Sequence, residues 1–230
     1  MKWRDITLQQ FQHIDLVNQD QDYDQIEKLL HTACIIYGHT EYTISQLPLK
    51  KVQKLIAKTA KLFSTQCPDM PRERIGRYFI DYNMEHLRLG QYVELTHFIQ
   101  AGPVDNADKI LASVAHTPFR KNRSSIHGKI ADYFLHAPVP DVIGSAKLVI
   151  ESFGRLNEKY KGLFSGGEGV TDSFNKYYGW IYSATIVAEH ERITLEQAFD
   201  LPITQALNDL AYLKSKAEYD KAQIKKHAQS

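Results

Sequence analysis

The sequence predicts a mainly α-helical protein with a small β-hairpin element, in which a three-helix unit occurs in tandem and a C-terminal helical segment follows. Three observations lead to this prediction. Apolar residues recur at helical spacing over most of the 230 residues. Residues 74–82 are instead rich in β-branched and aromatic side chains, which are typical of strands. Residues 5–14 align with residues 86–95 at an offset of 81, from 86 − 5.

The first two helices are predicted from their capping residues. Thr7 followed by Gln10 has the pattern of a capping box, so a helix is expected immediately after Thr7. An acidic connector follows, and Asp24 at its end is placed to cap a second helix at about residues 25–37. Gly38 fits the end of that helix, because glycine adopts the left-handed conformation of a helix C-terminus without strain.

The third helix, from Pro48, is predicted to be strongly amphipathic. Proline is favoured at the first helical position, and apolar residues from Val52 to Phe63 recur at helical spacing. Four lysines occupy the opposite face: Lys51, Lys54, Lys58 and Lys61. A solvated helix face is one interpretation of these lysines, and a surface for an acidic partner or a phosphate backbone is the other.

A linker with two prolines, residues 64–71, precedes the second copy. The strand predicted at residues 74–82 forms half of a hairpin. The helices of the second copy are expected near residues 90–100, 106–115 and 140–156, and the last of them aligns with the helix from Pro48 after a nine-residue slip. The loop before this last helix carries three basic residues that are expected to be exposed: Arg120, Lys121 and Arg123.

The remaining residues form the C-terminal segment. An aromatic-rich helix surrounds Trp180, Thr194 opens a short helix, and Pro202 opens a final one. From residue 214 onward this helix loses its apolar stripe and is expected to project into solvent. The predicted segments are residues 1–66 for the first copy, residues 72–160 for the strand and second copy, and residues 170–230 for the C-terminal segment.

An alternative explanation of the repeat is chance. Residues 193–197 also resemble residues 6–10, and capping chemistry alone generates such short similarities. Tandem duplication and recurrent capping signals both remain open from the sequence.

The composition excludes several classes of protein. An apolar fraction of 43% with 24% charged residues is ordinary for a soluble globular protein, and a formal charge of +1 argues against a general nucleic-acid binder. Two cysteines, Cys34 and Cys67, are too few for a disulfide framework and favour a reducing compartment. No apolar stretch is long enough for a membrane span or a signal peptide, so an intracellular protein is expected.

Catalytic and metal-binding motifs are not evident in the sequence. The glycine-rich residues 162–169 lack the Lys-Ser/Thr that follows a phosphate-binding loop, and neither His-Glu-x-x-His nor Cys-x-x-Cys occurs. His190 and Glu191 end a helix, where an imidazolium is favoured for structural reasons. Cys34 lies in an apolar run and is expected to be an inert core thiol. We therefore expect no enzyme, no cofactor, and no catalytic or metal-ligating residues.

Candidate partner-binding residues are of two kinds. The four lysines from Lys51 to Lys61 form the first, and the aromatic residues Tyr178, Trp180 and Tyr182 form the second. Tyrosine and tryptophan are frequent at protein-binding hot spots when they are exposed, although an aromatic cluster is more often part of a core.

The opening segment resembles small accessory proteins of tailed bacteriophages. Residues 2–11 read Lys-Trp-Arg-Asp-Ile-Thr-Leu-Gln-Gln-Phe, and Leu47-Pro48 then precedes a helix. Baseplate-hub and tail assembly chaperones are similar, as are some virion proteins. Residues 76–78, 89–92 and 180–182 fit the same pattern, as do Leu201-Pro202-Ile203 and residues 207–212. The motifs are short and touch most of the chain.

The resemblance implies a non-enzymatic protein that binds other phage proteins in tail, connector or baseplate assembly, as a chaperone or as a structural component. It implies a location in the host cytoplasm during assembly, and in the virion if the protein stays there. Partners would be other phage structural proteins or a further copy of the chain, with no membrane and no nucleic acid expected.

Two alternative functions remain. A nucleic-acid-associated helical module would use the lysine face and the basic loop at residues 120–123, and its binding would weaken steeply with salt. An enzyme of unrecognised type would cluster His, Glu and Ser side chains in a deep pocket.

Overall fold

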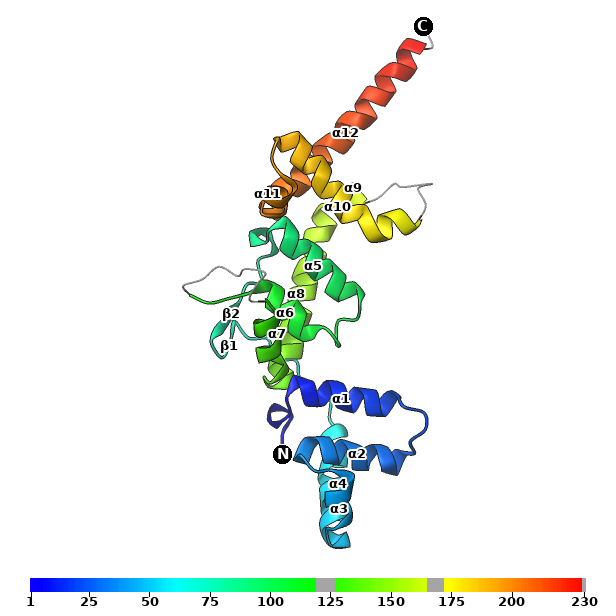
Figure 1. Ribbon diagram of the computed structural model, residues 1–230, viewed down its shortest axis with the longest axis vertical. Coiled ribbons are helices and arrows are strands. Elements are labelled where there is room, and N and C mark those ends of the chain that lie inside the picture. Colours follow the sequence, from blue (N-terminus) through cyan, green and yellow to red (C-terminus); the bar gives the residue numbers. More distant parts are fainter. Residues whose placement is uncertain (119–126, 165–171, 229–230) are drawn as a thin grey trace. The chain divides into compact units, whose positions relative to one another are not determined.

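The fold was established from a computed structural model that describes residues 1–118, 127–164 and 172–228, without the side chains of residues 164, 172–177 and 228. The predicted basic loop at Arg120 to Arg123 and most of the glycine-rich loop lie outside the described residues. The described chain is mainly helical with a small antiparallel sheet, which confirms the predicted fold class (Figure 1).

The α-helices are α1 (Leu8–Gln19), α2 (Gln25–Tyr37), α3 (Glu41–Ser45), α4 (Leu49–Phe63), α5 (Leu89–Gln100), α6 (Ala107–Val114), α7 (His127–Leu135), α8 (Val139–Lys159), α9 (Lys161–Phe164), α10 (Asp172–Glu191), α11 (Leu195–Phe199) and α12 (Ile203–Ala228). Two short 3-10 helices, η1 (Trp3–Asp5) and η2 (Met84–His86), precede α1 and α5. The strands are β1 (Arg74–Ile75), β2 (Tyr78–Ile80) and β3 (Ala115–His116).

Local capping fixes the helix ends as predicted. The backbone N–H of Gln10 donates to Thr7 Oγ1 at 3.2 Å, and that of Thr7 donates to Gln10 Oε1 at 3.0 Å, so the box satisfies two N–H groups that α1 would leave unpaired. Asp24 accepts from two backbone N–H groups at the start of α2. Gly38 ends that helix with φ of 66°, in the left-handed region.

A hairpin is present, but the single strand predicted over residues 74–82 is wrong: both strands of the hairpin, β1 and β2, lie within this range. β3 extends the hairpin to a three-stranded antiparallel sheet in the order β1-β2-β3. Gly76 makes the turn with φ of 57°, a conformation that glycine adopts without strain. β3 continues directly from α6, where the sequence predicts the end of a helix at residue 115 and a loop from residue 116. A two-residue strand contains no alternation that could reveal it.

The described chain separates into two compact units, and each contains two stretches of sequence. Unit 1 comprises Met1–Ile80 and Phe98–Val149, and unit 2 comprises Asp81–His97 and Ile150–Ser230. This division by spatial contact differs from the three predicted segments. The predicted linker, for example, packs within unit 1: the N–H of Met70 donates to the carbonyl of Pro140 at 3.1 Å.

In unit 1, α2 packs against α1 and α4, and α6 packs against α7 (Figure 1). The side chains of its core are almost fully buried: Ile6, Leu8, Ile14, Ile110, Leu111, Phe134, Val139, Val142 and Val149. Burial of this apolar surface is the main stabilising term for the unit.

In unit 2, α10 packs against α11 and α12. Its core contains Leu87, Leu89, Tyr92, Leu95, Ala184, Val187, Ile203, Ala206 and Leu207. Of the helices in the described part of the chain, none combines the length and the hydrophobicity that a bilayer span requires.

The two units share one backbone arrangement. In unit 1 the N–H of Leu8 donates to the carbonyl of Ala137 at 3.0 Å, and the N–H of Val139 donates to that of Ile6 at 2.9 Å. These bonds surround an isolated bridge between Thr7 and Pro138.

In unit 2 the same pair of bonds recurs. The N–H of Leu89 donates to the carbonyl of Leu201 at 2.9 Å, and the N–H of Ile203 donates to that of Leu87 at 2.8 Å. A bridge between Arg88 and Pro202 lies between them. The equivalent residues Ile6 and Leu87 of these two arrangements are 87 − 6 = 81 residues apart, which is the offset of the sequence repeat.

Candidate binding surfaces

The four predicted lysines lie together on the exposed face of α4. Lys51, Lys54, Lys58 and Lys61 are all exposed, whereas Thr59 and Leu62 of the same helix are buried. No ion pair within the described residues involves these lysines, so no carboxylate of the described part of the chain neutralises them. Lys58 and Lys61 also line a cleft of about 600 Å³ beside Trp3.

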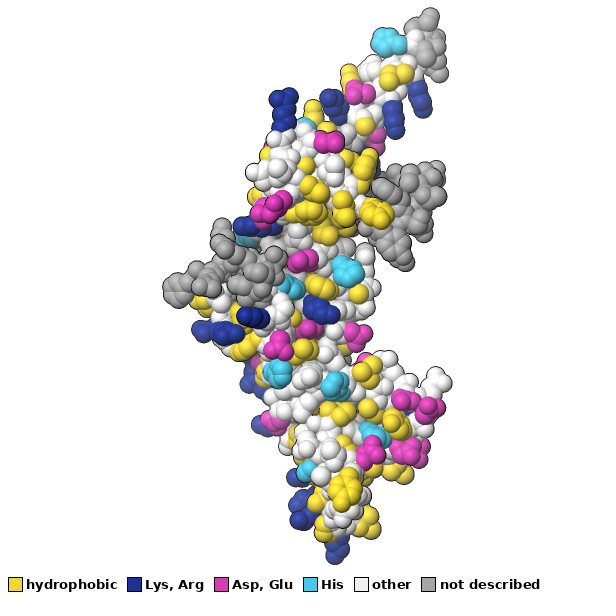
Figure 2. All heavy atoms as spheres, in the orientation of Figure 1, with side chains coloured by type: hydrophobic (Ala, Val, Ile, Leu, Met, Phe, Trp, Pro, Cys, Tyr) yellow, Lys and Arg dark blue, Asp and Glu magenta, His cyan; other side chains and the backbone are white. Residues whose placement is uncertain are grey.

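The aromatic candidates on α10 divide into two groups. Tyr178 and Tyr182 are 54% and 56% exposed, and Ile181 between them is 49% exposed. Their spacing of three and four residues places all three on one side of α10. Figure 2 shows hydrophobic side chains gathered on the surface over α10. We call Tyr178, Ile181 and Tyr182 the α10 face.

Trp180 lies on the other side of α10 and is half-buried. Its ring meets that of Tyr92 edge-on, with centroids 5.1 Å apart, and Tyr92 is itself 2% exposed. The Tyr92 hydroxyl donates to Asn157 Oδ1 at 2.5 Å, and burial raises the pKa of Tyr92 above its usual value. Trp180 therefore packs against the core of unit 2, while the α10 face is accessible to a partner.

A third surface, which the sequence did not reveal, is a cleft of about 760 Å³ beside the β1–β2 hairpin of unit 1. Five cationic side chains line it: Arg4, Arg72, Arg74, Arg77 and Lys129. Two carboxylates, Asp132 and Asp141, lie there too, so the formal charge is 5 − 2 = +3 with His136 neutral. Figure 2 shows Lys and Arg side chains gathered next to the hairpin. We call this site the cationic cleft.

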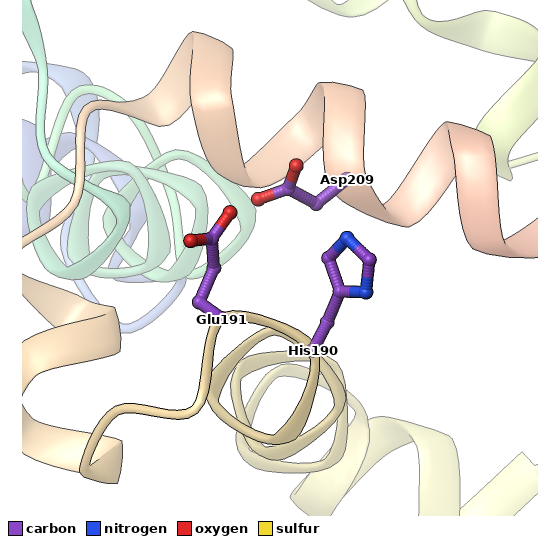
Figure 3. A group of neighbouring side chains, drawn as sticks. All are labelled: His190, Glu191 and Asp209. Atoms are coloured by element: carbon purple, nitrogen blue, oxygen red, sulfur yellow. The ribbon is translucent and has the colours of Figure 1, made fainter.

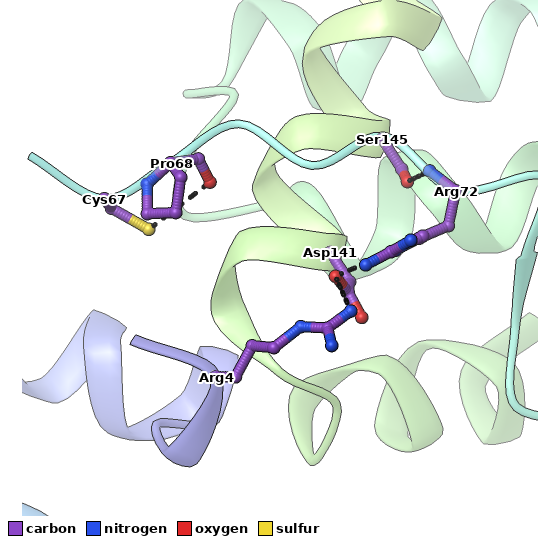
Figure 4. A network of polar contacts seen from close by, with 6 residues as sticks. All are labelled: Arg4, Cys67, Pro68, Arg72, Asp141 and Ser145. Carbon is purple, nitrogen blue, oxygen red and sulfur yellow. Dashed lines mark hydrogen bonds and ion pairs between the residues drawn. The ribbon is translucent and has the colours of Figure 1, made fainter. Parts of the chain in front are cut away.

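Asp141 on α8 neutralises part of the cationic cleft. Arg72 Nε donates to Asp141 Oδ1 at 3.1 Å, and Arg4 Nη2 lies 3.5 Å from the same oxygen (Figure 4). The backbone N–H of Arg72 donates to Ser145 Oγ at 2.9 Å, which ties the extended chain before the hairpin to α8. Residues about 70 and 137 positions apart thus meet here, a contact that no local pattern could reveal.

One group of side chains has the composition of a metal site. His190 and Glu191 at the end of α10 point toward Asp209 on α12, with their ligand atoms within 4.8 Å of one another (Figure 3). Imidazole and carboxylate groups suit Zn²⁺ or Mn²⁺. Exposed acidic groups are common without an ion, however, and His190 is exposed, so the geometry alone assigns no metal.

Within this group, the charged form of Asp209 is disfavoured. Burial first, and the negative charge of Glu191 second, raise the pKa of Asp209 above its usual value. Its Oδ2 is closed to solvent and has no hydrogen-bond partner among the described residues. Glu191 accepts a hydrogen bond from Gln205 at 3.3 Å.

The pair that most resembles a nucleophile and its base is Ser113 and His127, with Oγ 3.1 Å from Nε2. Ser113 Oγ also donates to the carbonyl of Lys109 at 3.0 Å, so the imidazole is placed to donate to the hydroxyl rather than to accept its proton. Ser113 is 1% exposed, which closes it to a substrate. The geometry is that of a buried structural hydrogen bond.

Both thiols have a raised pKa, chiefly because of burial. Cys34 is 7% exposed and Glu41 adds to the effect, while Asp69 adds to it at Cys67. A raised pKa disfavours the thiolate, which is the reactive form.

Comparison of the chain with protein-family models, with curated proteins and with solved structures gives no match.

Proposed function

We propose that this chain is a non-enzymatic bacteriophage protein that binds other phage proteins during tail, connector or baseplate assembly. The observation that carries the binding role is the α10 face, where two tyrosines and an isoleucine are about half exposed on one side of a helix. Tyrosine at such a position combines a large contact area with a polar tip, which is typical of a protein-binding hot spot. The phage assignment is supported by the resemblance of residues 2–11 and the later Leu-Pro motifs.

The site of action in this proposal is the host cytoplasm, where tails and baseplates assemble. A chaperone leaves the assembly before it is complete, whereas a structural component stays in the virion. The partner is another phage structural protein, and further copies of the chain take part only if the same face pairs with itself.

The binding role is tested with a double variant, Tyr178→Ser with Tyr182→Ser. A tagged chain is recovered from host cells during infection by the encoding phage, and the phage proteins that co-purify are identified by mass spectrometry. We expect tail, connector or baseplate proteins with the unchanged chain and at least a tenfold lower yield with the double variant, since hot-spot residues each contribute about 2 kcal/mol or more.

The matched control is Tyr42→Ser with Tyr219→Ser, two tyrosines that are 74% and 62% exposed outside the α10 face. Recovery of the same proteins with this control is expected. Equal losses in both double variants would contradict a specific role of the α10 face.

Mass spectrometry of purified virions and of assembly intermediates separates the two forms of the proposal. A fixed stoichiometry in virions identifies a structural component, and presence in intermediates alone identifies a chaperone. Absence from both would reject the phage assignment, as would a genomic neighbourhood without head or tail genes.

The unneutralised lysines of α4 favour one competing function, nucleic-acid binding. It predicts that affinity for DNA falls by orders of magnitude between about 50 and 200 mM salt, because each neutralised phosphate releases counterions. Fluorescence anisotropy with the unchanged chain and with the four lysines replaced by glutamine measures this directly. Affinity that is absent, or unchanged by salt, rejects it.

A further inference from the structure

We propose that the cationic cleft of unit 1 binds an acidic peptide segment of a partner protein. This proposal uses a different surface from the α10 face and does not depend on a phage origin. It rests on the pairing of the charges in the cleft, on the way its arginines are held, and on the carboxylates among them.

Most of the positive charge in the cleft has no counter-charge among the residues that the structure describes. Arg4 and Arg72 share the single carboxylate of Asp141. Arg74, Arg77 and Lys129 form no ion pair with any residue that the structure describes. Like charges held close together repel one another, and an anionic ligand would remove that repulsion. The whole chain has a formal charge of only +1, so the charge of +3 is a local property of this cleft.

Two of these arginines are held in place by contacts that do not use their terminal donors. The guanidinium of Arg77 lies over the rings of Tyr78 and Tyr133, 5.0 and 5.4 Å from their centroids. The guanidinium of Arg74 lies 5.1 Å from the Phe79 ring centroid, and its Nε donates to the carbonyl of Gly76 at 2.6 Å. Ring stacking fixes a guanidinium while its Nη groups still point outward, so little entropy is lost when a ligand binds.

The turn of the hairpin positions both arginines. Gly76 lies between them with a positive φ, and a Cβ at this position would lie 1.7 Å from the Tyr133 hydroxyl. Glycine therefore allows the turn to pack directly on α7. Arg74 and Arg77 consequently reach the same cleft as Lys129, which α7 contributes.

The chemistry favours carboxylates carried on a peptide. A guanidinium binds a carboxylate through two parallel hydrogen bonds, and a volume of about 760 Å³ is in the range of clefts that hold ligands of a few residues. Asp132 also lies in the cleft, is exposed, and forms no ion pair among the described residues. Its charge would repel a continuous phosphate backbone, whereas a peptide can place a backbone N–H or a lysine beside it.

The test is fluorescence anisotropy of a labelled hexaglutamate peptide with the full chain at low salt. The variant Arg74→Ala with Arg77→Ala is expected to weaken binding at least about tenfold, because it removes two charge-assisted contacts. The control, Lys216→Ala with Lys221→Ala, removes the same charge from exposed positions of α12 and is expected to change binding less than about twofold. Equal weakening by both variants would show a general charge effect and overturn the proposal.

Two further arms identify the ligand chemistry and guard against misfolding. Arg77→Lys keeps the charge but loses the planar fork, so we expect an intermediate affinity with an unchanged circular dichroism spectrum and melting temperature. A labelled hexathymidylate is measured beside the peptide. Tighter binding of this oligonucleotide that depends on the same arginines would overturn the proposal in favour of nucleic acid, and no binding of the peptide would also overturn it.

Discussion

A Cβ atom added at Gly144 would lie 2.3 Å from the backbone nitrogen of Met70 and 2.8 Å from its carbonyl carbon. Gly144 therefore lets the extended chain after Cys67 run directly against α8, where Met70 and Arg72 make their backbone hydrogen bonds. The neighbour is backbone rather than a flexible side chain, so it has little freedom to move away.

We predict that Gly144→Ala lowers the free energy of unfolding by about 1–3 kcal/mol, the range for an overpacked site. Gly154 in the same helix is the matched control, because a Cβ there meets nothing within 4 Å. Gly154→Ala is expected to raise stability by about 0.5–1 kcal/mol through the higher helix propensity of alanine. Urea denaturation of the two variants measures both values, and similar stabilities would contradict the close packing at Gly144.

Asp209 is predicted to lower stability at neutral pH. Its folded-state pKa is raised, so the folded state binds its proton more tightly than the unfolded state does. Stability is therefore lost as the pH rises from the unfolded pKa through the raised value. Asp209→Asn removes this loss, and we expect a gain on the order of 0.5 kcal/mol at pH 7, kept small by solvent screening.

The gain from Asp209→Asn should disappear below the usual aspartate pKa of about 3.9, where both states are protonated. Asp220→Asn, at an exposed position of the same helix, is the control and should change little. Urea denaturation at several pH values makes the comparison. A gain that is independent of pH would show that the carboxyl charge is not its cause.

At the scale of elements, α12 changes from buried to exposed along its length. Ile203, Ala206 and Leu207 in its first turns are buried, whereas residues 215–222 are all exposed. The sequence predicts this exposure from the loss of the apolar stripe, although the helix continues to Ala228. A largely exposed helical segment of about 12 residues is marginal in water.

Hydrogen exchange followed by mass spectrometry should therefore divide α12. We expect amides of residues 217–227 to exchange orders of magnitude faster than those of residues 206–211, because local opening of the exposed turns requires little free energy. Equal protection along the helix of the isolated chain would contradict this prediction. Protection that appears only when a partner is added would locate a contact on the exposed turns.

The helix ends show which elements could be predicted from the sequence. The capping residues Thr7, Asp24 and Thr194 all accept hydrogen bonds from N–H groups two or three residues later. Such bonds depend only on neighbours in sequence, so a local pattern identifies them. The β-branched and aromatic residues of 74–82 correctly predicted β-structure there, but as one strand rather than the two strands of a hairpin, and the two-residue β3 was not predicted.

At the scale of the whole chain, the sequence repeat corresponds to a repeated pair of backbone hydrogen bonds around an isolated bridge. Thr7 and Arg88, which the repeat aligns, both form bridges, but their partners Pro138 and Pro202 are 202 − 138 = 64 residues apart. The sequence alignment instead paired the helix that follows Pro138 with the helix from Pro48. The first segment of each bridge, at Thr7 and Arg88, was found because the capping segment recurs in one register. The second segment, at Pro138 and Pro202, was missed because only hydrogen bonds between residues more than 100 positions apart identify it.

The sequence by itself determined most of the helices, their caps and the lysine face of α4, because each follows from residues within about four positions of one another. It did not predict α3, α7 or α9, and it predicted one strand over residues 74–82 where β1 and β2 form a hairpin. Only the tertiary structure decided that Trp180 packs against Tyr92 while Tyr178 and Tyr182 stay exposed. It alone also assembled the cationic cleft, whose arginines and aspartates come from distant parts of the sequence. Both outcomes depend on which elements pack together, and that is a property of the fold rather than of any local pattern.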